Sequence, residues 1–570
     1  MEHIKKSVWF AGMGLIATGN SLAASKQEVP KRPNIVLILA DDMGYSDITP
    51  YGGEIHTPNL DTLAQNGVKF TNFQVTPYSG PSRAALLTGT DPHTAGLGNL
   101  NEITRPEQRA GNAEGYRGAL NSKAVTLAEY LQKAGYRTIL SGKWHLGYKD
   151  GEGPENHGFD RSLALMRGEY YHFKSPTLNQ YGLQTTYGVY NEPEGMEVYR
   201  LNGKVTTMPD NFFSTINYTD FAIQEIENRS KNQPFFVYLA YTAPHSPLQA
   251  PEKDIAKYAD KYIDGPQKLA DSRMRRLKQM GLIAKNIPNR KLVGTPEWDS
   301  LSADERAAES KRMQVYAAMV DNMDSNIGRL MSKLRERGEL KNTIFVFLSD
   351  NGAAGASRER DARWGKWVSG AHNNQLEKMG SAESYISTGP DWAQASNTPY
   401  YLFKGYTTEG GIRSPLIISG PGVAKKGIDG AYGDITDITP TLLSLAHISV
   451  KTPEGKNPIT GINLSQRLAK PNPQFRGPKQ ARVMEMMGGK MVKKGDYKAV
   501  ATSHFAKIHG LDNAGIVKQK WQLFNVINDP AESHDLAKKK PTILKKLVDI
   551  YKNYSYQQGV VEVSPTKLGD

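Results

Sequence analysis

The sequence predicts an α/β fold built on a large, mixed but mainly parallel β-sheet that is sandwiched by helices. Short apolar runs rich in β-branched residues, at 34–40 and 343–348, indicate buried strands. Helical patterns at 125–134 and 312–337 separate runs of this kind. Strands that alternate with helices are typical of a parallel sheet. Further candidate strands occur at 138–140, 235–240 and 416–419.

Residues 1–24 have the pattern of a secretory signal peptide. Lys5 and Lys6 precede an apolar run at 8–18, and small residues end the segment at Ala24. This run is too short to cross a bilayer, which disfavours the alternative of an N-terminal membrane anchor. No other segment has transmembrane character, so we expect no membrane span once the signal is removed.

The composition excludes two kinds of site. The 570 residues include no cysteine, which rules out a disulfide framework and a thiolate metal site. The formal net charge is +13, but the basic residues are spread along the chain, with only short clusters such as 275–276 and 538–540. A loosely basic surface, or attraction to anionic substrates, explains this distribution better than a nucleic-acid surface does.

Polar side chains follow two of the predicted strands directly. Asp41 and Asp42 come after the first strand, and Asp350 and Asn351 come after the strand at 343–348. Ligands of parallel sheets bind beyond the carboxyl ends of the strands, so the two pairs could converge on one site. Their hard oxygen donors are the type that calcium or magnesium takes. Either pair alone is more readily explained as an N-cap or a turn.

The chain is predicted to divide at residue 447. Residues 25–447 contain the strands and helices above and form the expected catalytic domain. Residues 448–570 begin with a stretch rich in proline and glycine and form a smaller α+β domain. Its predicted elements are strands at 497–501 and 521–526 and an amphipathic helix at 541–554.

Two segments of the larger domain lack a clear period. Residues 170–217 are rich in Tyr, Gly, Asn and Pro, and residues 251–298 are polar and basic. Both are predicted to be loops or insertions near the site.

Residues 77–89 predict a loop that runs into a helix. Pro81 suits the first turn of that helix and Gly89 suits its end. Ser79 would then lie just before a helix N-terminus, where free backbone donors and the helix dipole favour a sulfate or phosphate group. A plain N-cap at Ser79 or Ser82 explains the same pattern equally well.

The same segment resembles the first signature of the sulfatase family: Cys or Ser, any residue, Pro, Ser, Arg and a small apolar helix ending in Leu-Thr-Gly. Residues 135–145 are similar to the family's second signature, and the two occur in the usual order. The resemblance continues through 244–245, 349–352 and 404–415 and so spans nearly the whole mature chain. It implies an alkaline-phosphatase-like fold, a smaller C-terminal domain with an antiparallel sheet, and hydrolysis of sulfate esters.

The resemblance also implies a site, residue by residue. One ion per chain, calcium rather than magnesium, would be bound by Asp41, Asp42, Ser79, Asp350 and Asn351. Arg83 would steady the modified Ser79 and the metal site. The other pocket residues would be Lys143, His145, His245 and Lys404, and all of these except His145 would bind substrate. Taken singly, these four are more often ordinary surface lysines or loop histidines.

In the implied reaction, Ser79 is oxidised to formylglycine, whose aldehyde hydrates to a gem-diol. One diol oxygen, ionised with the help of calcium, would attack sulfur while Lys143 and Lys404 offset charge on the sulfuryl oxygens. His245, supported by Lys404, would protonate the leaving alcohol. His145 would take a proton from the second hydroxyl and so expel sulfate.

Ser79 stands where many family members carry cysteine. Serine-type members resemble proteins that are matured by a bacterial radical-SAM maturase in the cytoplasm. We therefore expect modification before or during export through the secretion machinery, and a periplasmic enzyme. Without that maturase the chain would remain unmodified and largely inactive as a sulfatase.

The expected substrates are aryl sulfates, because residues 395–399 with Lys404, and residues 115–121, resemble bacterial arylsulfatases. Tyr170 and Tyr171 could pack a phenyl ring, although tyrosines in irregular loops more often pack on the surface.

Two other functions remain open. The first is a phosphatase or phosphodiesterase of the same superfamily with unmodified Ser79 as nucleophile; such enzymes commonly use zinc with several histidine ligands, and the metal set here has none. The second is a non-catalytic binder of sulfated glycans that retains only the anion pocket. Turnover of an aryl sulfate and an aryl phosphate, measured side by side, would distinguish the three.

Overall fold

The structure, a computed structural model, describes residues 32–174, 198–361, 364–470, 480–503 and 520–562. The predicted signal peptide at 1–24 lies outside the described residues. Residues 33–570 group into one compact unit, and the predicted boundary at residue 447 stays a prediction. Within the described parts of the chain, no helix is both long and apolar enough to cross a membrane.

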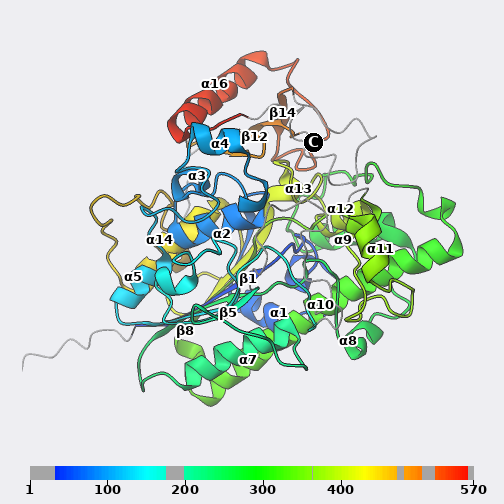
Figure 1. Ribbon diagram of the computed structural model, residues 1–570. Coiled ribbons are helices and arrows are strands. Elements are labelled where there is room, and N and C mark those ends of the chain that lie inside the picture. Colours follow the sequence, from blue (N-terminus) through cyan, green and yellow to red (C-terminus); the bar gives the residue numbers. More distant parts are fainter. Residues whose placement is uncertain (1–31, 175–197, 362–363, 471–479, 504–519, 563–570) are drawn as a thin grey trace, which may run out of the picture. The chain divides into compact units, whose positions relative to one another are not determined.

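A ten-stranded mixed sheet forms the centre of the unit (Figure 1). Its central strand β1 (Asn34–Ala40) is buried at every residue and pairs in parallel with β7 (Phe235–Ala240) and β8 (Thr343–Ser349). The strand order is β10-β2-β9-β8-β1-β7-β3-β4-β5-β6. The remaining strands are β2 (Gly67–Gln74), β3 (Arg137–Lys143), β4 (Arg161–Leu165), β5 (Tyr199–Leu201), β6 (Lys204–Val205), β9 (Arg413–Ser419) and β10 (Gly427–Asp434).

The predicted α/β class is confirmed, and every strand predicted for the large sheet is present. β3 and β4 extend the parallel part of the sheet beyond β7. The predicted strand at 416–419 lies within β9, which is antiparallel to both β8 and β2. The sheet is therefore parallel from β8 to β4, with antiparallel pairs at β9 on one side and at β5 and β6 on the other.

Two hydrophobic cores cover the two faces of the sheet, and alternate residues of β1 point into each. Val36 and Ile38 belong to one core, and Ile35 and Leu37 belong to the other. The first core includes side chains of α1 (Pro58–Gln65), α7 (Ser214–Glu227) and α10 (Ala303–Glu336). The second includes side chains of α2 (Ser79–Thr88), α5 (Leu127–Lys133) and α14 (Ile438–Leu445). Burial on both faces explains why β1 is a continuous apolar run.

The helix α10 begins earlier than the predicted range of 312–337. Ser302 accepts a hydrogen bond from the backbone N–H of Glu305, and the Glu305 side chain accepts one from the backbone N–H of Ser302. This capping box starts the helix at Ala303. The first turns carry mostly polar side chains, so no apolar period marks them in the sequence.

The prediction of an irregular segment at 251–298 is wrong for much of its length. It contains α8 (Glu252–Ala256) and α9 (Gly265–Gln279). α9 buries only a narrow stripe, and its buried Arg273 pairs with Asp47 at 2.5 Å. Leu269, Ala270, Met274 and Leu277 do recur at helical spacing on the buried face of α9, but the polar and basic composition of the whole segment outweighs this short stripe. In 170–217 the described residues include the short strands β5 and β6 and the start of α7, and residues 175–197 lie outside the description.

The predicted antiparallel sheet near the C-terminus is confirmed. It has four strands, β11 (Arg482–Met486), β12 (Gly489–Lys494), β13 (Tyr497–Ala501) and β14 (Gln522–Asn525). The helix α16 (Pro541–Gln558) lies against this sheet (Figure 1). Its buried side chains Leu547 and Tyr551 pack on Val492, Ala499 and Leu523.

A buried histidine links this C-terminal sheet to α3 (Pro92–Ala95). His93 Nε2 lies 3.0 Å from Glu485 Oε2 in β11, and His93 Nδ1 lies 3.3 Å from Asp91 Oδ1. The hydroxyl of Tyr554 in α16 donates to Asp91 at 2.9 Å. Burial by itself lowers the pKa of His93, but the two carboxylates outweigh it and raise this pKa to about 9.

Candidate active site

The two predicted acidic pairs meet at the carboxyl ends of β1 and β8. The backbone N–H of Asp42 donates to Asp350 Oδ1 at 3.2 Å, and Asn351 Nδ2 donates to Asp42 Oδ1 at 2.6 Å. Asp41, Asp42, Asp350 and Asn351 are all at most 1% exposed. Asp42 has a φ of 64°, a left-handed conformation that is rare for a residue other than glycine and that concentrates at functional sites. The predicted convergence of the two strand ends is present.

The residue after Asn351 has to be glycine. A Cβ built on Gly352 would lie 1.9 Å from the carbonyl oxygen of Gly410, far inside van der Waals contact. The Gly352 N–H donates to the carbonyl oxygen of Gly411 at 3.1 Å. The short helix α13 (Glu409–Ile412), directly before β9, therefore packs on the backbone that carries Asn351.

Ser79 is the first residue of α2, and its hydroxyl faces the acidic cluster. Ser79 Oγ lies 2.9 Å from Asp41 Oδ1, 2.5 Å from Asp350 Oδ2 and 3.5 Å from Asn351 Oδ1. The N-cap position belongs to Tyr78, whose side chain makes no capping hydrogen bond. The geometry therefore disfavours a capping role for Ser79, because its hydroxyl points at carboxylates rather than at the helix.

Ser82 is occupied elsewhere in the same turn. Its Oγ accepts a hydrogen bond from the backbone N–H of Thr76 at 2.9 Å and lies 2.8 Å from the Thr76 hydroxyl. Ser82 therefore stabilises the loop that leads into α2, and its hydroxyl does not contact the acidic cluster that Ser79 faces. Gly89 ends the helix in the left-handed conformation, as expected from the sequence.

Two buried cations hold the acidic cluster on the α2 side. Arg83 Nη2 lies 2.8 Å from Asp350 Oδ2, and its Nη1 donates to the carbonyl oxygen of Lys143 at 3.2 Å. Lys143, the last residue of β3, places Nζ 2.7 Å from Asp41 Oδ2 and 3.2 Å from Ser79 Oγ. Arg83 and Lys143 are both fully buried. One network of ion pairs and hydrogen bonds thus joins Ser79 to the ends of the two strands.

Lys404 and His245 contact the cluster from the other side. Lys404 Nζ lies 2.7 Å and 2.8 Å from the two carboxylate oxygens of Asp42. His245 Nε2 lies 3.3 Å from Asp42 Oδ2 and 3.9 Å from Glu169 Oε2. Asp42 therefore pairs with a lysine and a histidine at the same time.

The charges around Asp41 and Asp42 keep both carboxylates ionised. Burial alone raises the pKa of Asp41, but Lys143, His245 and Arg83 outweigh it and hold this pKa well below its usual value. Burial also raises the pKa of Asp42, and Lys404 and His245 outweigh it in the same way.

The donor set fits a hard divalent cation. Carboxylate oxygens of Asp41 and Asp350 both lie within 3 Å of Ser79 Oγ, yet one hydroxyl has a single hydrogen to donate. Several carboxylates and an amide oxygen at one place are the ligands that calcium takes. Ligand atoms of Asp41, Asp42 and His245 lie within 4.8 Å of one another, so His245 also belongs geometrically to this group.

His145 lies at the edge of the cluster and has a partner that the sequence did not indicate. Its Nε2 lies 3.2 Å from Glu102 Oε1. Burial lowers the pKa of His145, with Lys143 and Arg83 acting in the same direction and Glu102 opposing them. Of the predicted site residues, the structure places nine in one contact network and His145 beside it. The nine are Asp41, Asp42, Ser79, Arg83, Lys143, His245, Asp350, Asn351 and Lys404.

Glu169 is the second carboxylate that the sequence did not indicate, although it follows soon after the end of β4. Glu169 Oε1 pairs with Arg358 Nη2 at 2.6 Å. Aromatic side chains adjoin this pair. Tyr170, Tyr171, Trp364, Trp367 and Tyr385 line a small cavity with Glu169 and Arg358. The predicted Tyr170 and Tyr171 are therefore part of an aromatic cluster that reaches His245 through Glu169.

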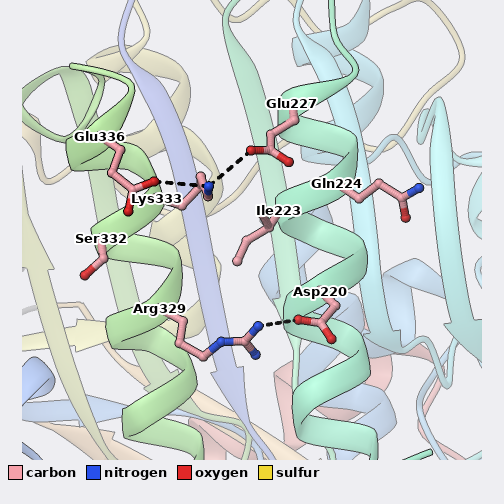
Figure 2. A pocket seen from close by; sticks show the side chains of 8 residues that line it. All are labelled: Asp220, Ile223, Gln224, Glu227, Arg329, Ser332, Lys333 and Glu336. Atoms are coloured by element: carbon pink, nitrogen blue, oxygen red, sulfur yellow. Dashed lines mark hydrogen bonds and ion pairs between the residues drawn. The ribbon is translucent and has the colours of Figure 1, made fainter.

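A surface depression between α7 and α10 has a different character (Figure 2). Arg329 Nη2 pairs with Asp220 at 2.6 Å, and Lys333 Nζ pairs with Glu227 at 3.4 Å and Glu336 at 3.1 Å. These side chains are partly or largely exposed, where ion pairs contribute little. None of the residues that contact Ser79 lines this depression.

Comparisons with known proteins agree on one family. The family model described as Sulfatase matches residues 33–448. An uncharacterized sulfatase of Schizosaccharomyces pombe is 37% identical over 562 residues, which cover 95% of this chain and 96% of that protein. An arylsulfatase of Klebsiella aerogenes is 37% identical over 470 residues, with 81% and 97% covered. The crystal structure of Ps i-CgsB with k-i-k-neocarrahexaose is 26% identical, with a TM-score of 0.63 and 94% and 96% of the two chains covered.

Proposed function

The chain belongs to the sulfatase family and is a sulfuric ester hydrolase, and on this premise we propose that its nucleophile is built on Ser79. The observation that carries the proposal is the position of Ser79 Oγ, 2.9 Å and 2.5 Å from two carboxylates and 3.2 Å from Lys143 Nζ. A serine hydroxyl is a weak nucleophile, and nearby carboxylate charges oppose its ionisation. We therefore propose that Ser79 is converted to formylglycine, whose hydrated aldehyde supplies the nucleophilic oxygen.

The proposed metal is one calcium ion held by oxygen atoms of Asp41, Asp42, Asp350, Asn351 and the modified Ser79. When bound, it supplies positive charge that favours ionisation of a neighbouring hydroxyl. The three carboxylates face Arg83, Lys143 and Lys404, so the side chains alone nearly balance in charge. A divalent ion would make the pocket cationic, which suits a sulfate ester with its negative charge.

The side chains divide the remaining tasks. Lys143 and Lys404 bind the sulfate oxygens and offset the charge that develops on them. His245 donates a proton to the oxygen of the departing alcohol, which keeps the electron pair of the broken sulfur–oxygen bond. His145 accepts a proton in the step that releases sulfate. Arg83 holds the Asp350 carboxylate and the Lys143 backbone, so it orients the groups on which the others depend.

We propose aryl sulfate esters as substrates. The cluster of Tyr170, Tyr171, Trp364, Trp367 and Tyr385 supports this class, because aromatic rings pack favourably on one another. The arylsulfatase of Klebsiella aerogenes is a relative over most of this chain. One of the similar solved structures contains a neocarrahexaose. Carbohydrate sulfates are therefore the alternative substrate class, and their turnover should be compared with that of aryl sulfates.

We further propose that a radical-SAM maturase modifies Ser79 in the cytoplasm and that secretion machinery then exports the enzyme to the periplasm. The signal-like pattern at 1–24 and the serine at position 79 support this order of events. Deleting 1–24 should retain active enzyme in the cytoplasm of a host that has the maturase, and unchanged export would contradict the proposal.

Mass spectrometry of the peptide containing Ser79 tests the central proposal. Conversion to formylglycine removes two hydrogens, and the modified fraction should track turnover of an aryl sulfate. Ser79→Ala should abolish that turnover and leave the fold intact, while Ser332→Ala, at an exposed position in α10, should change neither. Full activity of wholly unmodified protein, or faster turnover of the matching aryl phosphate, would refute the proposal.

A further inference from the structure

The carboxylate of Glu102 contacts His145 from a segment that carries no sequence motif. Glu102 belongs to the 3-10 turn η2 (Asn101–Ile103), and its Oε1 lies 3.2 Å from His145 Nε2. The two side chains are 14% and 9% exposed. A hydrogen bond from a neutral imidazole to a carboxylate, shielded from water to this degree, is stronger than the same bond at the surface.

The backbone around His145 fixes the position of its ring. His145 has a φ of 55°, and such a conformation persists in a non-glycine residue only where the surroundings enforce it. A Cβ built on Gly168 would lie 2.8 Å from ring atom Cε1, so glycine leaves the space that the ring occupies. The carbonyl oxygen of His145 lies 3.4 Å from a Cβ built on Gly80, the residue after Ser79. The backbone of His145 therefore lies beside the residue that follows Ser79, and Gly168 leaves room for the ring.

The two ring nitrogens have different surroundings. Nε2 faces Glu102, which accepts but cannot donate a hydrogen bond while it is ionised. Burial raises the pKa of Glu102, but His145 outweighs it and keeps this pKa below its usual value. Nδ1 is buried, and no group in the described parts of the chain forms a hydrogen bond with it. The hydrogen therefore belongs on Nε2 and the lone pair on Nδ1.

We infer that Glu102 is a positioning residue for His145, holding the ring as the Nε2–H tautomer so that Nδ1 can accept a proton. The inference rests on the proposed role of His145 in sulfate release. In that step the proton moves from the free hydroxyl of the sulfated diol to Nδ1, and the O–H electron pair forms the C=O bond. The bond from the same carbon to the sulfate oxygen breaks, sulfate leaves with that electron pair, and the imidazolium later returns the proton to water. Glu102 stays ionised throughout and stabilises the imidazolium. Carboxylates that orient histidines act in this way in other enzymes.

The first test measures the tautomer and needs no turnover. Nitrogen-15 NMR of histidine-labelled full-length protein, with the His145 signals assigned from His145→Gln, reports which nitrogen carries the hydrogen. We expect the Nε2–H form in the wild type and in Glu102→Gln, since the glutamine oxygen can accept the same hydrogen bond. Glu102→Ala should populate both tautomers. Glu114→Gln, at an exposed position in the same part of the chain, should match the wild type.

The second test separates kcat from KM for an aryl sulfate, with the formylglycine content of each preparation measured by mass spectrometry. Glu102→Gln should lower kcat by roughly 10- to 100-fold and leave KM nearly unchanged, because it removes part of a general-base contribution of about 10²- to 10⁴-fold. Wild-type kcat in Glu102→Gln, or an Nδ1–H tautomer in the wild type, would overturn the inference. If Glu102→Ala does not fold, the kcat of the isosteric Glu102→Gln and the tautomer of the wild type decide. A wild-type enzyme without sulfate-ester turnover would refute the proposed function. The tautomer measurement does not depend on turnover, so it would still test whether Glu102 positions His145.

Discussion

Replacing His93 by glutamine should remove about 3 kcal/mol of stability that the wild type has at neutral pH and loses under alkaline conditions. His93 is 2% exposed and lies between Asp91 and Glu485, whose charges raise its pKa from 6.5 to about 9. A group whose pKa is higher in the folded state binds its proton more tightly there. Its contribution to stability is therefore complete below pH 6.5 and is lost as the pH rises through about 9.

The size of the effect follows from the same values. Each tenfold change in proton affinity corresponds to about 1.4 kcal/mol, so the charged His93 contributes about 3 kcal/mol to the free energy of unfolding at pH 6. No large reduction for solvent screening applies, because the histidine and Glu485 are nearly inaccessible to water. This contribution links α3 to the C-terminal sheet, so its loss should loosen that contact first.

Urea titrations at pH 6 and pH 9.5, followed by tryptophan fluorescence and circular dichroism, measure the difference. The wild type should lose about 3 kcal/mol more than His93→Gln over this range, while both should be similar at pH 9.5. His534→Gln is the matched control, because that histidine is exposed and belongs to the same C-terminal region. Equal pH dependence in the wild type and His93→Gln would refute the reasoning.

Three other perturbations test separate parts of the structure. Chelation should lower the thermal unfolding temperature and abolish activity, and calcium at 100 times its dissociation constant should restore about 2.7 kcal/mol, which zinc should not do; unchanged unfolding with and without calcium would contradict the metal proposal. Trp367→Ala should lower kcat/KM for an aryl sulfate by roughly 10-fold through a weaker ring contact, while Trp521→Ala should not, and equal effects would remove the aromatic cluster from substrate binding. Lys498→Met should cost about 3–5 kcal/mol in urea unfolding, because Lys498 lies 3.0 Å from each of two buried carboxylates, Glu409 and Glu532. The exposed Lys494→Met is its control, and equal stability of the two variants would show that the buried pairs contribute little.

The sequence predicts best those features that are marked by a local pattern of residues, such as an apolar run or a proline at the start of a helix. β1 and β8 are buried on both faces, so their residues form continuous apolar runs with polar residues directly after them. The position of Asp41 and Asp350 at adjacent strand ends then follows from the parallel arrangement. The segment leading into α2 is likewise marked by Pro81 and Gly89 at the places that a helix start and end require.

The features that sequence missed depend on contacts between distant segments. Glu102 lies in a single 3-10 turn and Glu169 in a loop, where no period marks a side chain that reaches a histidine. The direction of β9 depends on how residues 350–412 return to the sheet, which its own apolar run does not encode. The apolar stripe of α9 is short, and the polar and basic residues around it favour a loop over a helix.

The Asn351-Gly352 pair has a consequence for the lifetime of the protein. Asparagine followed by glycine is prone to deamidation, in which the glycine backbone nitrogen attacks the side-chain amide. Here the glycine cannot be exchanged for a safer residue, because a Cβ would meet the Gly410 carbonyl at 1.9 Å. The folded chain protects the pair instead, since the Gly352 N–H is engaged with Gly411 and the Asn351 amide with Asp42. Deamidation of Asn351 should therefore occur mainly in molecules that have unfolded locally. A less stable variant would then also lose this asparagine faster.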